Sequence, residues 1–158
     1  MLTIDEAALA AMRTHAEQAF PEECCGVLFA SPKGPVLRRL TNIQNRLHSA
    51  DPARHPRDAR TAYEPEPREL FEVNRQGDQP GWRIAAFYHS HPDHDAYFSP
   101  TDKDRASYEE PESGREPLYP GVVWVVLSVY ERTVRAVKAY GWDEATHDFI
   151  EVPLSVTP

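Results

Sequence analysis

The sequence predicts a mixed α/β fold that forms one domain over residues 1–158. Three observations support this. The expected helices and strands follow one another in the order αββαβαβββ, Gly121–Tyr130 is almost continuously apolar, and no repeat or linker divides the chain. A near-continuous apolar run is typical of a strand that is buried on both faces. With 41% hydrophobic residues, the chain can bury a core without disulfides or other staples.

A helix is expected first. Thr3-Ile4-Asp5-Glu6 has the pattern of a capping box, in which the Thr3 side chain accepts from the Glu6 amide and Glu6 reaches back. Apolar residues then recur every four positions and form one stripe of an amphipathic helix: Ala8, Met12, Ala16 and Phe20. Pro21 ends this helix.

A pair of strands and a long loop follow. Cys25–Ala30 is a short apolar run closed by the turn residues Ser31–Gly34, and Pro35–Ile43 is expected to be the returning strand. Asn45–Tyr63 is polar, contains two prolines and four arginines, and shows no hydrophobic period. It therefore predicts a loop, and loops of that length inside a compact domain are usually functional or mobile.

The middle of the chain predicts two helices with a strand between them. Pro67–Gln76 is expected to be helical, with a modest apolar face made by Leu70, Phe71 and Val73. Trp82–Tyr88 predicts a strand that runs directly into His89. Ser99-Pro100-Thr101-Asp102 is a helix start, with Ser99 as N-cap, proline at the first helical position and an acid at the third. The helix is expected to reach Tyr108.

The last third predicts strands. Glu109–Pro120 contains three prolines and a glycine and is expected to be a polar loop. Gly121–Tyr130 follows as the buried strand. Thr133–Tyr140 and Phe149–Val156 alternate between apolar and polar residues, so they are expected to be partly exposed strands beside it.

Composition excludes several classes of protein. The net charge of −8 and the lack of a basic run argue against a nucleic-acid binder. The longest aliphatic and aromatic run, Val122–Leu127, is far too short to cross a membrane. Asp5 and Glu6 stand where a secretion signal would carry Lys or Arg. The only cysteines, Cys24 and Cys25, are adjacent and rarely form a structural disulfide, so a cytoplasmic location is expected.

The densest group of potential metal ligands lies just past the third predicted strand. His89 and His91 are two residues apart, so in extended backbone both imidazoles point to the same side. Asp102 follows in the first turn of the next predicted helix, where a carboxylate could join them. Three protein ligands with a fourth position left open are typical of a catalytic zinc site. As purely structural alternatives, Ser99 and Asp102 are explained as a capping pair, and His94 as a solvated loop residue.

The spacing of these residues resembles a known motif. His89-Ser90-His91-Pro92, six further residues, Ser99, two more and Asp102 looks like the motif of the JAMM (MPN+) metalloproteases. That family also needs an upstream glutamate before a Cys-Gly pair, and Glu23-Cys24-Cys25-Gly26 stands at that place. The likeness covers essentially the whole chain, and a compact chain of this kind looks like the prokaryotic stand-alone branch.

The resemblance implies both a fold and a site. The fold would be a single MPN-type domain, a mixed and mostly antiparallel β-sheet flanked by helices, with cytidine-deaminase-like architecture. Carried over to this chain, His89, His91 and Asp102 would hold one Zn²⁺, and Glu23 would be the general base for a zinc-bound water. Ser99 would donate to the oxyanion of the tetrahedral intermediate. Glu22 is the competing carboxylate, and the spacing to the Cys-Gly pair selects Glu23.

The same resemblance implies a function and a partner. The chain would be a zinc peptidase or isopeptidase that cleaves after the C-terminal Gly-Gly of a small β-grasp sulfur-carrier or ubiquitin-like protein. The Asn45–Tyr63 loop is a candidate for contact with the substrate's tail. The main alternative is a non-catalytic MPN scaffold that binds a ubiquitin-like partner, because many MPN domains have lost their ligands.

Three other enzyme classes are weaker alternatives. His89–His94 also matches the HxHxDH string of metallo-β-lactamases, but only His147 is available downstream as a further histidine ligand. A zinc deaminase would need a C-x-x-C pair, which the chain lacks. A nucleophilic Cys24 or Cys25 paired with a histidine stays open on spacing alone, although a cysteine in an apolar strand is more often inert.

Overall fold

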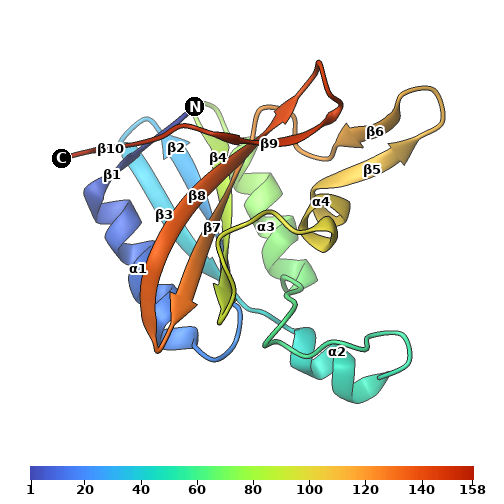
Figure 1. The fold of residues 1–158 in the computed structure, drawn as a ribbon. Helices are drawn as coiled ribbons and strands as arrows, with labels where there is room; N and C mark the ends of the chain where they lie inside the picture. The colour runs from blue at the N-terminus through green and yellow to red at the C-terminus, as the bar shows by residue number, and fades with distance from the viewer.

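A computed structural model describes all 158 residues. Four helices and ten strands follow one another along the chain (Figure 1): β1 (Leu2–Asp5), α1 (Glu6–Ala19), β2 (Cys25–Ser31), β3 (Gly34–Leu40), α2 (Gln44–Ala50), α3 (Pro67–Gly77), β4 (Arg83–Pro92), α4 (Pro100–Ala106), β5 (Ser107–Glu110), β6 (Gly114–Pro117), β7 (Val123–Tyr130), β8 (Thr133–Asp143), β9 (Asp148–Val152) and β10 (Leu154–Thr157). No helix has the length and apolar character that crossing a bilayer requires.

A six-stranded sheet forms the centre of the molecule. Its order is β3-β2-β4-β7-β8-β9, and β4 and β7 are its one parallel pair. The predicted mixed, mostly antiparallel sheet is therefore confirmed. β7 lies in the interior of the sheet and six of its eight residues are buried, as its continuous apolar sequence predicts. Two smaller sheets pair β1 with β10 and β5 with β6.

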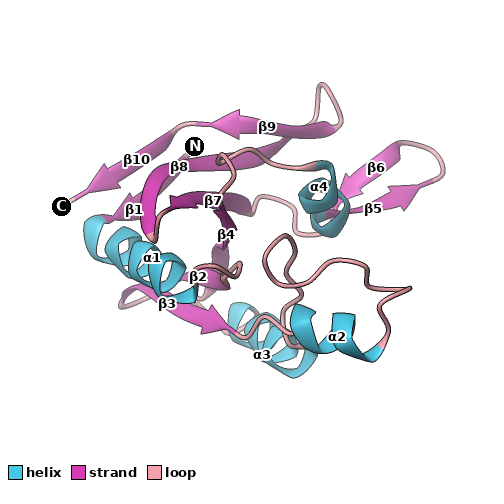
Figure 2. Ribbon diagram, turned by 60° about the horizontal axis from the view of Figure 1, so that its bottom comes forward, coloured by secondary structure: helices cyan, strands magenta, loops and turns pink.

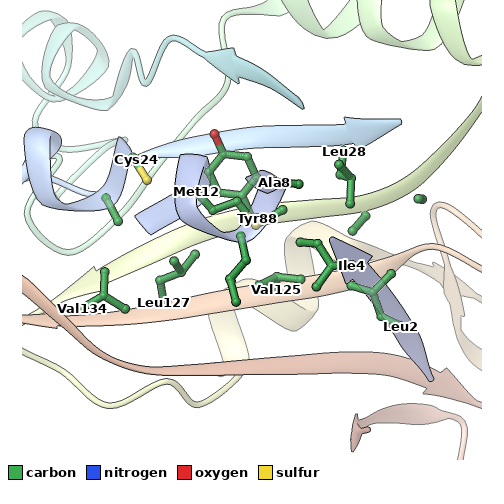
Figure 3. Packing of buried hydrophobic residues seen from close by; sticks show 14 of the residues in the cluster. Leu2, Ile4, Ala8, Met12, Cys24, Leu28, Tyr88, Val125, Leu127 and Val134 are labelled. Atoms are coloured by element: carbon green, nitrogen blue, oxygen red, sulfur yellow. The ribbon is translucent and has the colours of Figure 1, made fainter. Parts of the chain in front are cut away.

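Helices cover the two faces of the sheet (Figures 1 and 2). On one face α1 packs Met12 and Ala16, both fully buried, against alternate residues of the central strands, such as Leu28 and Leu127. Figure 3 shows side chains from β1, α1 and the central strands gathered in this cluster, around Tyr88. On the opposite face, α3 and α4 contribute side chains to a second core, rich in aromatic rings. The metal-competent residues lie on this second face.

The N-terminal helix begins later than its sequence pattern indicates. Thr3 belongs to β1, which pairs in parallel with β10 at the other end of the chain. The N-cap is therefore Asp5, whose carboxylate accepts from the Ala8 amide at 2.6 Å. The predicted capping box at Thr3 and Glu6 is wrong, because β1 continues through Asp5 and the helix begins only at Glu6.

Four further predictions need correction. The expected loop over Asn45–Tyr63 contains most of α2, which has no side-chain cap. The expected loop over Glu109–Pro120 instead contributes to the β5–β6 hairpin. Phe71, expected on the apolar face of α3, is 62% exposed, whereas Val73 of the same helix is fully buried. The last predicted strand is divided into β9 and β10 at Pro153.

Gly26 is required by the packing of its cross-strand neighbour. It pairs with Tyr88 across β2 and β4, and a Cβ atom at Gly26 would lie 2.3 Å from the Tyr88 ring. The ring is held in place because Tyr88 is 1% exposed and its hydroxyl lies 2.8 Å from Nδ1 of His15. The glycine of the Glu-Cys-Cys-Gly sequence thus leaves room for an aromatic ring across the strands.

Replacing this glycine should destabilise the fold. We expect Gly26→Ala to lower the free energy of unfolding by about 3 kcal/mol, because the added methyl group must displace a buried ring. Gly141→Ala is the matched control in another strand, since its Cβ would meet only the end of the Val152 side chain, at 3.2 Å. Urea unfolding of both variants checks this, and equal losses would contradict the steric explanation.

Candidate metal centre

The pairing of β2 with β4 brings the two halves of the candidate site together. Cys25 lies opposite His89 in the register. One residue beyond this pair, the Cys24 amide donates to Oγ of Ser90 at 2.8 Å, and the Ser90 amide donates to the Cys24 carbonyl at 3.1 Å. Glu23, just before the start of β2, therefore lies beside the two histidines, although it precedes them by more than sixty residues.

His89, His91 and Asp102 converge on one point. The Nε2 atoms of the two histidines lie 3.1 Å apart, and each is 3.2 Å from an oxygen of the Asp102 carboxylate. Ligands held about 2.0–2.1 Å from a tetrahedral zinc ion lie roughly 3.3 Å from one another, close to the separations in this cluster. All three residues are buried. The donor set and its spacing therefore fit a small divalent metal ion.

The tautomer of His91 supports the same conclusion. Its Nδ1 lies 2.8 Å from the Asp95 carbonyl, so in the neutral ring this nitrogen carries the proton and donates it. The lone pair of Nε2 then faces the other acceptors, an arrangement that a cation satisfies. The loop bearing Asp95 is itself held, because Ser128 donates to the His94 carbonyl at 2.6 Å and Tyr130 donates to the Asp95 carboxylate at 3.0 Å.

His89 is enclosed more completely than His91. Its ring is stacked on Tyr63 with the centroids 4.7 Å apart, and its Nδ1 has no hydrogen-bond partner in the protein. Burial lowers the pKa of His89 and outweighs the opposing effect of Asp102. The imidazole is thereby kept neutral, which is the form that binds a metal.

Asp102 and Ser99 form the capping box that the sequence predicts at the start of α4. The Asp102 amide donates to Oγ of Ser99 at 3.1 Å, and the Ser99 amide donates to Oδ2 of Asp102 at 2.9 Å. This fixes the carboxylate in the first turn, where it faces the imidazoles. Burial opposes ionisation of Asp102, but His89 and His91 outweigh it and hold the pKa well below its usual value.

Glu23 is a buried carboxylate at the edge of this cluster. One of its oxygens lies within 4.8 Å of the ligand atoms of both histidines, and no other side chain or amide hydrogen-bonds its carboxylate. Burial raises the pKa of Glu23 to about 8, against the charges of His91, Arg105 and Arg57. The neighbouring Glu22 is exposed and accepts instead from the Asn45 side chain. Of the two candidate carboxylates, Glu23 alone joins the histidines.

Residues that the sequence did not single out position the site. Asn42 donates to the Glu23 carbonyl at 2.9 Å and also to the Ala62 carbonyl. Arg105 lies over the Tyr63 ring, 5.0 Å from its centroid, and pairs with Glu64. No local sequence signal marks these residues, because each acts through a contact far away in the chain. Ser90 is different, because it lies inside the His-Ser-His motif and the motif could have indicated it.

The cluster opens into a polar cleft with a volume of about 350 Å³. Glu23, His91, Asp102 and Ser99 all line it, so four of the five predicted site residues face one cavity, while His89 lies behind them. The cleft wall also contains exposed His94 and three arginines, Arg57, Arg60 and Arg105. Buried, convergent ionisable groups in a cleft are typical of a catalytic centre.

The adjacent cysteines are not part of this cavity. Both thiols are buried and free. Burial raises the pKa of Cys24 to about 12 and the pKa of Cys25 still further. Because the thiolate is the nucleophilic form of cysteine, neither side chain is poised for nucleophilic attack.

Comparison with known proteins gives a family match. Residues 5–140 match the model for prokaryotic homologues of the JAB domain. A desampylase from Haloferax volcanii is 31% identical to the chain over 108 residues, which are 68% of this chain and 63% of the desampylase. The match thus spans less than two thirds of that relative's length.

Solved structures share the fold. A protein from Desulfitobacterium hafniense superposes with a TM-score of 0.69 at 20% identity, over 99% of this chain and 93% of that one. A protein from Salinibacter ruber gives 0.59 at 24% identity, over 99% and 92%. A JAB1/MPN domain protein from Archaeoglobus fulgidus gives 0.54 at 17% identity, over 99% and 100%.

Proposed function

The chain belongs to the prokaryotic JAB (JAMM/MPN) family, and from this premise we propose that it is a zinc peptidase or isopeptidase. It cleaves after the C-terminal Gly-Gly of a small β-grasp sulfur-carrier or ubiquitin-like protein. The observation that carries this proposal is the convergence of His89, His91 and Asp102 with the buried carboxylate of Glu23 in one cleft. The relative named desampylase supports a ubiquitin-like substrate.

In this proposal His89, His91 and Asp102 hold one Zn²⁺ per chain. Two imidazoles and a carboxylate are a common ligand set of hydrolytic zinc. The ion, when bound, polarises the scissile carbonyl and lowers the pKa of water from 15.7 toward roughly 7. The protein's contribution is to present three ligands from a strand end and a helix start and to leave one side of the cluster open to the cleft.

Glu23 moves the proton. Its carboxylate takes a proton from the attacking water, whose oxygen bonds to the carbonyl carbon of the second glycine, and then gives that proton to the leaving amine as the C–N bond breaks. A catalytic pKa near the working pH suits both transfers. In the metal-free protein burial raises the pKa of Glu23 far above that of an ordinary carboxyl, and a bound cation would bring it down again. With no other hydrogen-bond partner in the protein, this carboxylate is free to act on water and amine in turn.

Ser99 stabilises the negative charge that develops on the carbonyl oxygen. Its Oγ already accepts from the Asp102 amide, and this bond turns the hydroxyl proton away from the helix and leaves it free to donate. Donation to an oxyanion of this kind typically lowers the activation free energy by about 3 kcal/mol. The capping role and the catalytic role of Ser99 are therefore compatible.

A tailed carrier tests this function. A small β-grasp carrier that ends in Gly-Gly plus further residues should be cut after the second glycine by the zinc-loaded protein, as measured by mass spectrometry. Replacing that glycine by valine should block cleavage while leaving the carrier folded, because the proposal requires the two glycines to pass close to the metal, where a branched side chain would collide with the cleft wall. Phenanthroline should stop the reaction.

Two controls separate this proposal from its alternatives. Alkylation of thiols should leave the rate unchanged, since Cys24 and Cys25 are buried and their pKa values are raised. Inhibition by alkylation with zinc still bound would instead favour a cysteine nucleophile. Stable binding of a tailed carrier without any cleavage would favour a non-catalytic scaffold.

A further inference from the structure

Two arginines at the cleft have no partner of opposite charge. Arg57 and Arg60 line the same cavity as Glu23 and Asp102. No carboxylate forms an ion pair with either guanidinium, whereas the third arginine of the cleft, Arg105, is paired with Glu64. The nearest polar contact is a long one, 3.5 Å from Nη1 of Arg57 to Oγ1 of Thr101, the residue before Asp102. In a chain with 25 acidic and 17 basic residues, two free cations beside a catalytic centre point to an anionic ligand.

The backbone that carries these arginines is fixed to the site. The Arg57 carbonyl accepts from the side chain of Gln44, which is buried in α2, at 2.8 Å. The Ala59 amide donates to the Asn45 side chain at 2.8 Å, and the Ala59 carbonyl accepts from the Glu23 amide at 2.7 Å. The arginine segment is thereby attached directly to the residue that carries the catalytic carboxylate. This reduces the ordering that binding would otherwise require.

Both arginines line the same cavity as the Glu23 carboxylate. Glu23 hands its proton to the departing amine, so the departing residue lies next to Glu23 in the productive complex. The two glycines before the scissile bond carry no charge. After the scissile bond, the nearest anion is the α-carboxylate of the departing residue, provided that this residue is the last one of the substrate.

We propose that Arg57 and Arg60 bind the α-carboxylate of the residue that is released, so that the enzyme prefers to trim a C-terminal residue from a Gly-Gly tail. This inference rests on the proposed peptidase function and narrows its substrate class. A guanidinium recognises a carboxylate through charge-assisted and often bidentate hydrogen bonds. An isopeptide bond to an internal lysine offers no carboxylate at this place and should be a poorer substrate.

The test compares two forms of one substrate. A β-grasp carrier that ends in Gly-Gly-Ala is prepared with a free C-terminal carboxylate and with a C-terminal carboxamide, and kcat/KM is measured for both. The native enzyme should favour the acid by about tenfold to a hundredfold, the range expected for hydrogen bonds to a charged group. Arg57→Gln and Arg60→Gln should each reduce this ratio, and the double variant should bring it close to one.

Arg54→Gln is the matched control, because Arg54 is exposed in the same segment and does not line the cleft. It should keep the native ratio. Metal content and thermal unfolding show whether the variants are intact. Equal rates on acid and amide by the native enzyme would overturn the carboxylate site and leave the peptidase function standing. Cleavage of neither form would overturn both.

Discussion

Glu23→Gln is expected to keep its fold and its metal while losing a factor of at least 10²–10⁴ in kcat, the usual contribution of general acid–base catalysis. Glutamine has nearly the same shape as glutamate but cannot accept the proton of the attacking water. Single-turnover cleavage of a tailed carrier measures the loss, and metal analysis of the same preparation shows that the ligands still hold the ion.

The neighbouring carboxylate supplies the control for this prediction. Glu22→Gln should be nearly neutral, because Glu22 is exposed and its one side-chain partner is Asn45. If Glu22→Gln were the damaging change and Glu23→Gln were mild, the general base would be assigned to the wrong residue. Equal losses of activity in the two variants would indicate that both substitutions disturb the backbone of this segment.

Stability provides a second readout for Glu23. Burial raises its folded-state pKa from 4.5 to about 8, so the unfolded chain ionises this group at lower pH than the folded chain. The metal-free protein should therefore lose stability as the pH rises from about 4.5 to 8, and Glu23→Gln should remove that part of the loss. If metal-free Glu23→Gln is at least as stable as the metal-free native protein at neutral pH, the Glu23 carboxylate serves function rather than folding.

Most of the candidate site could be predicted from the sequence, because the positions of its histidines and of Asp102 follow from local rules. Two histidines separated by one residue on a strand share a side, and the structure places their Nε2 atoms 3.1 Å apart. Ser99 and Asp102 make a capping box, which fixes the carboxylate in the first turn of α4 whatever the rest of the chain does. Glu23 could not be derived from spacing at all; it came from the resemblance to the family.

Elements that depend on distant contacts could not be predicted in the same way. Thr3 and Asp5 are both good N-cap residues, and the pairing of β1 with β10 decides between them. The helix α2 has no amphipathic period, and contacts such as that of Gln44 with the Arg57 carbonyl, across the expected loop, help to hold it. Arg57 and Arg60 are unremarkable in the sequence, and only the fold shows that they are unpaired and face the cleft.

His91→Ala is expected to reduce bound zinc severalfold and to abolish peptidase activity. In the proposed site it leaves two protein ligands, His89 and Asp102, and two ligands seldom retain the ion. The substitution also frees the Asp95 carbonyl, which accepts from Nδ1 of His91 at 2.8 Å, so the loop that follows should loosen as well. Metal content after dialysis, compared with that of the native protein treated in the same way, measures the effect.

His94→Ala is the matched control, because His94 is an exposed histidine that lines the same cleft without touching the cluster. It should keep full zinc occupancy. Asp102→Asn should lose the ion as His91→Ala does, since each oxygen of the Asp102 carboxylate lies 3.2 Å from one imidazole nitrogen. Full zinc occupancy in His91→Ala would overturn the ligand assignment. If Glu23→Gln lost zinc and Asp102→Asn retained it, the roles assigned to the two carboxylates would be exchanged. Glu23 would then be the metal ligand beside the histidines.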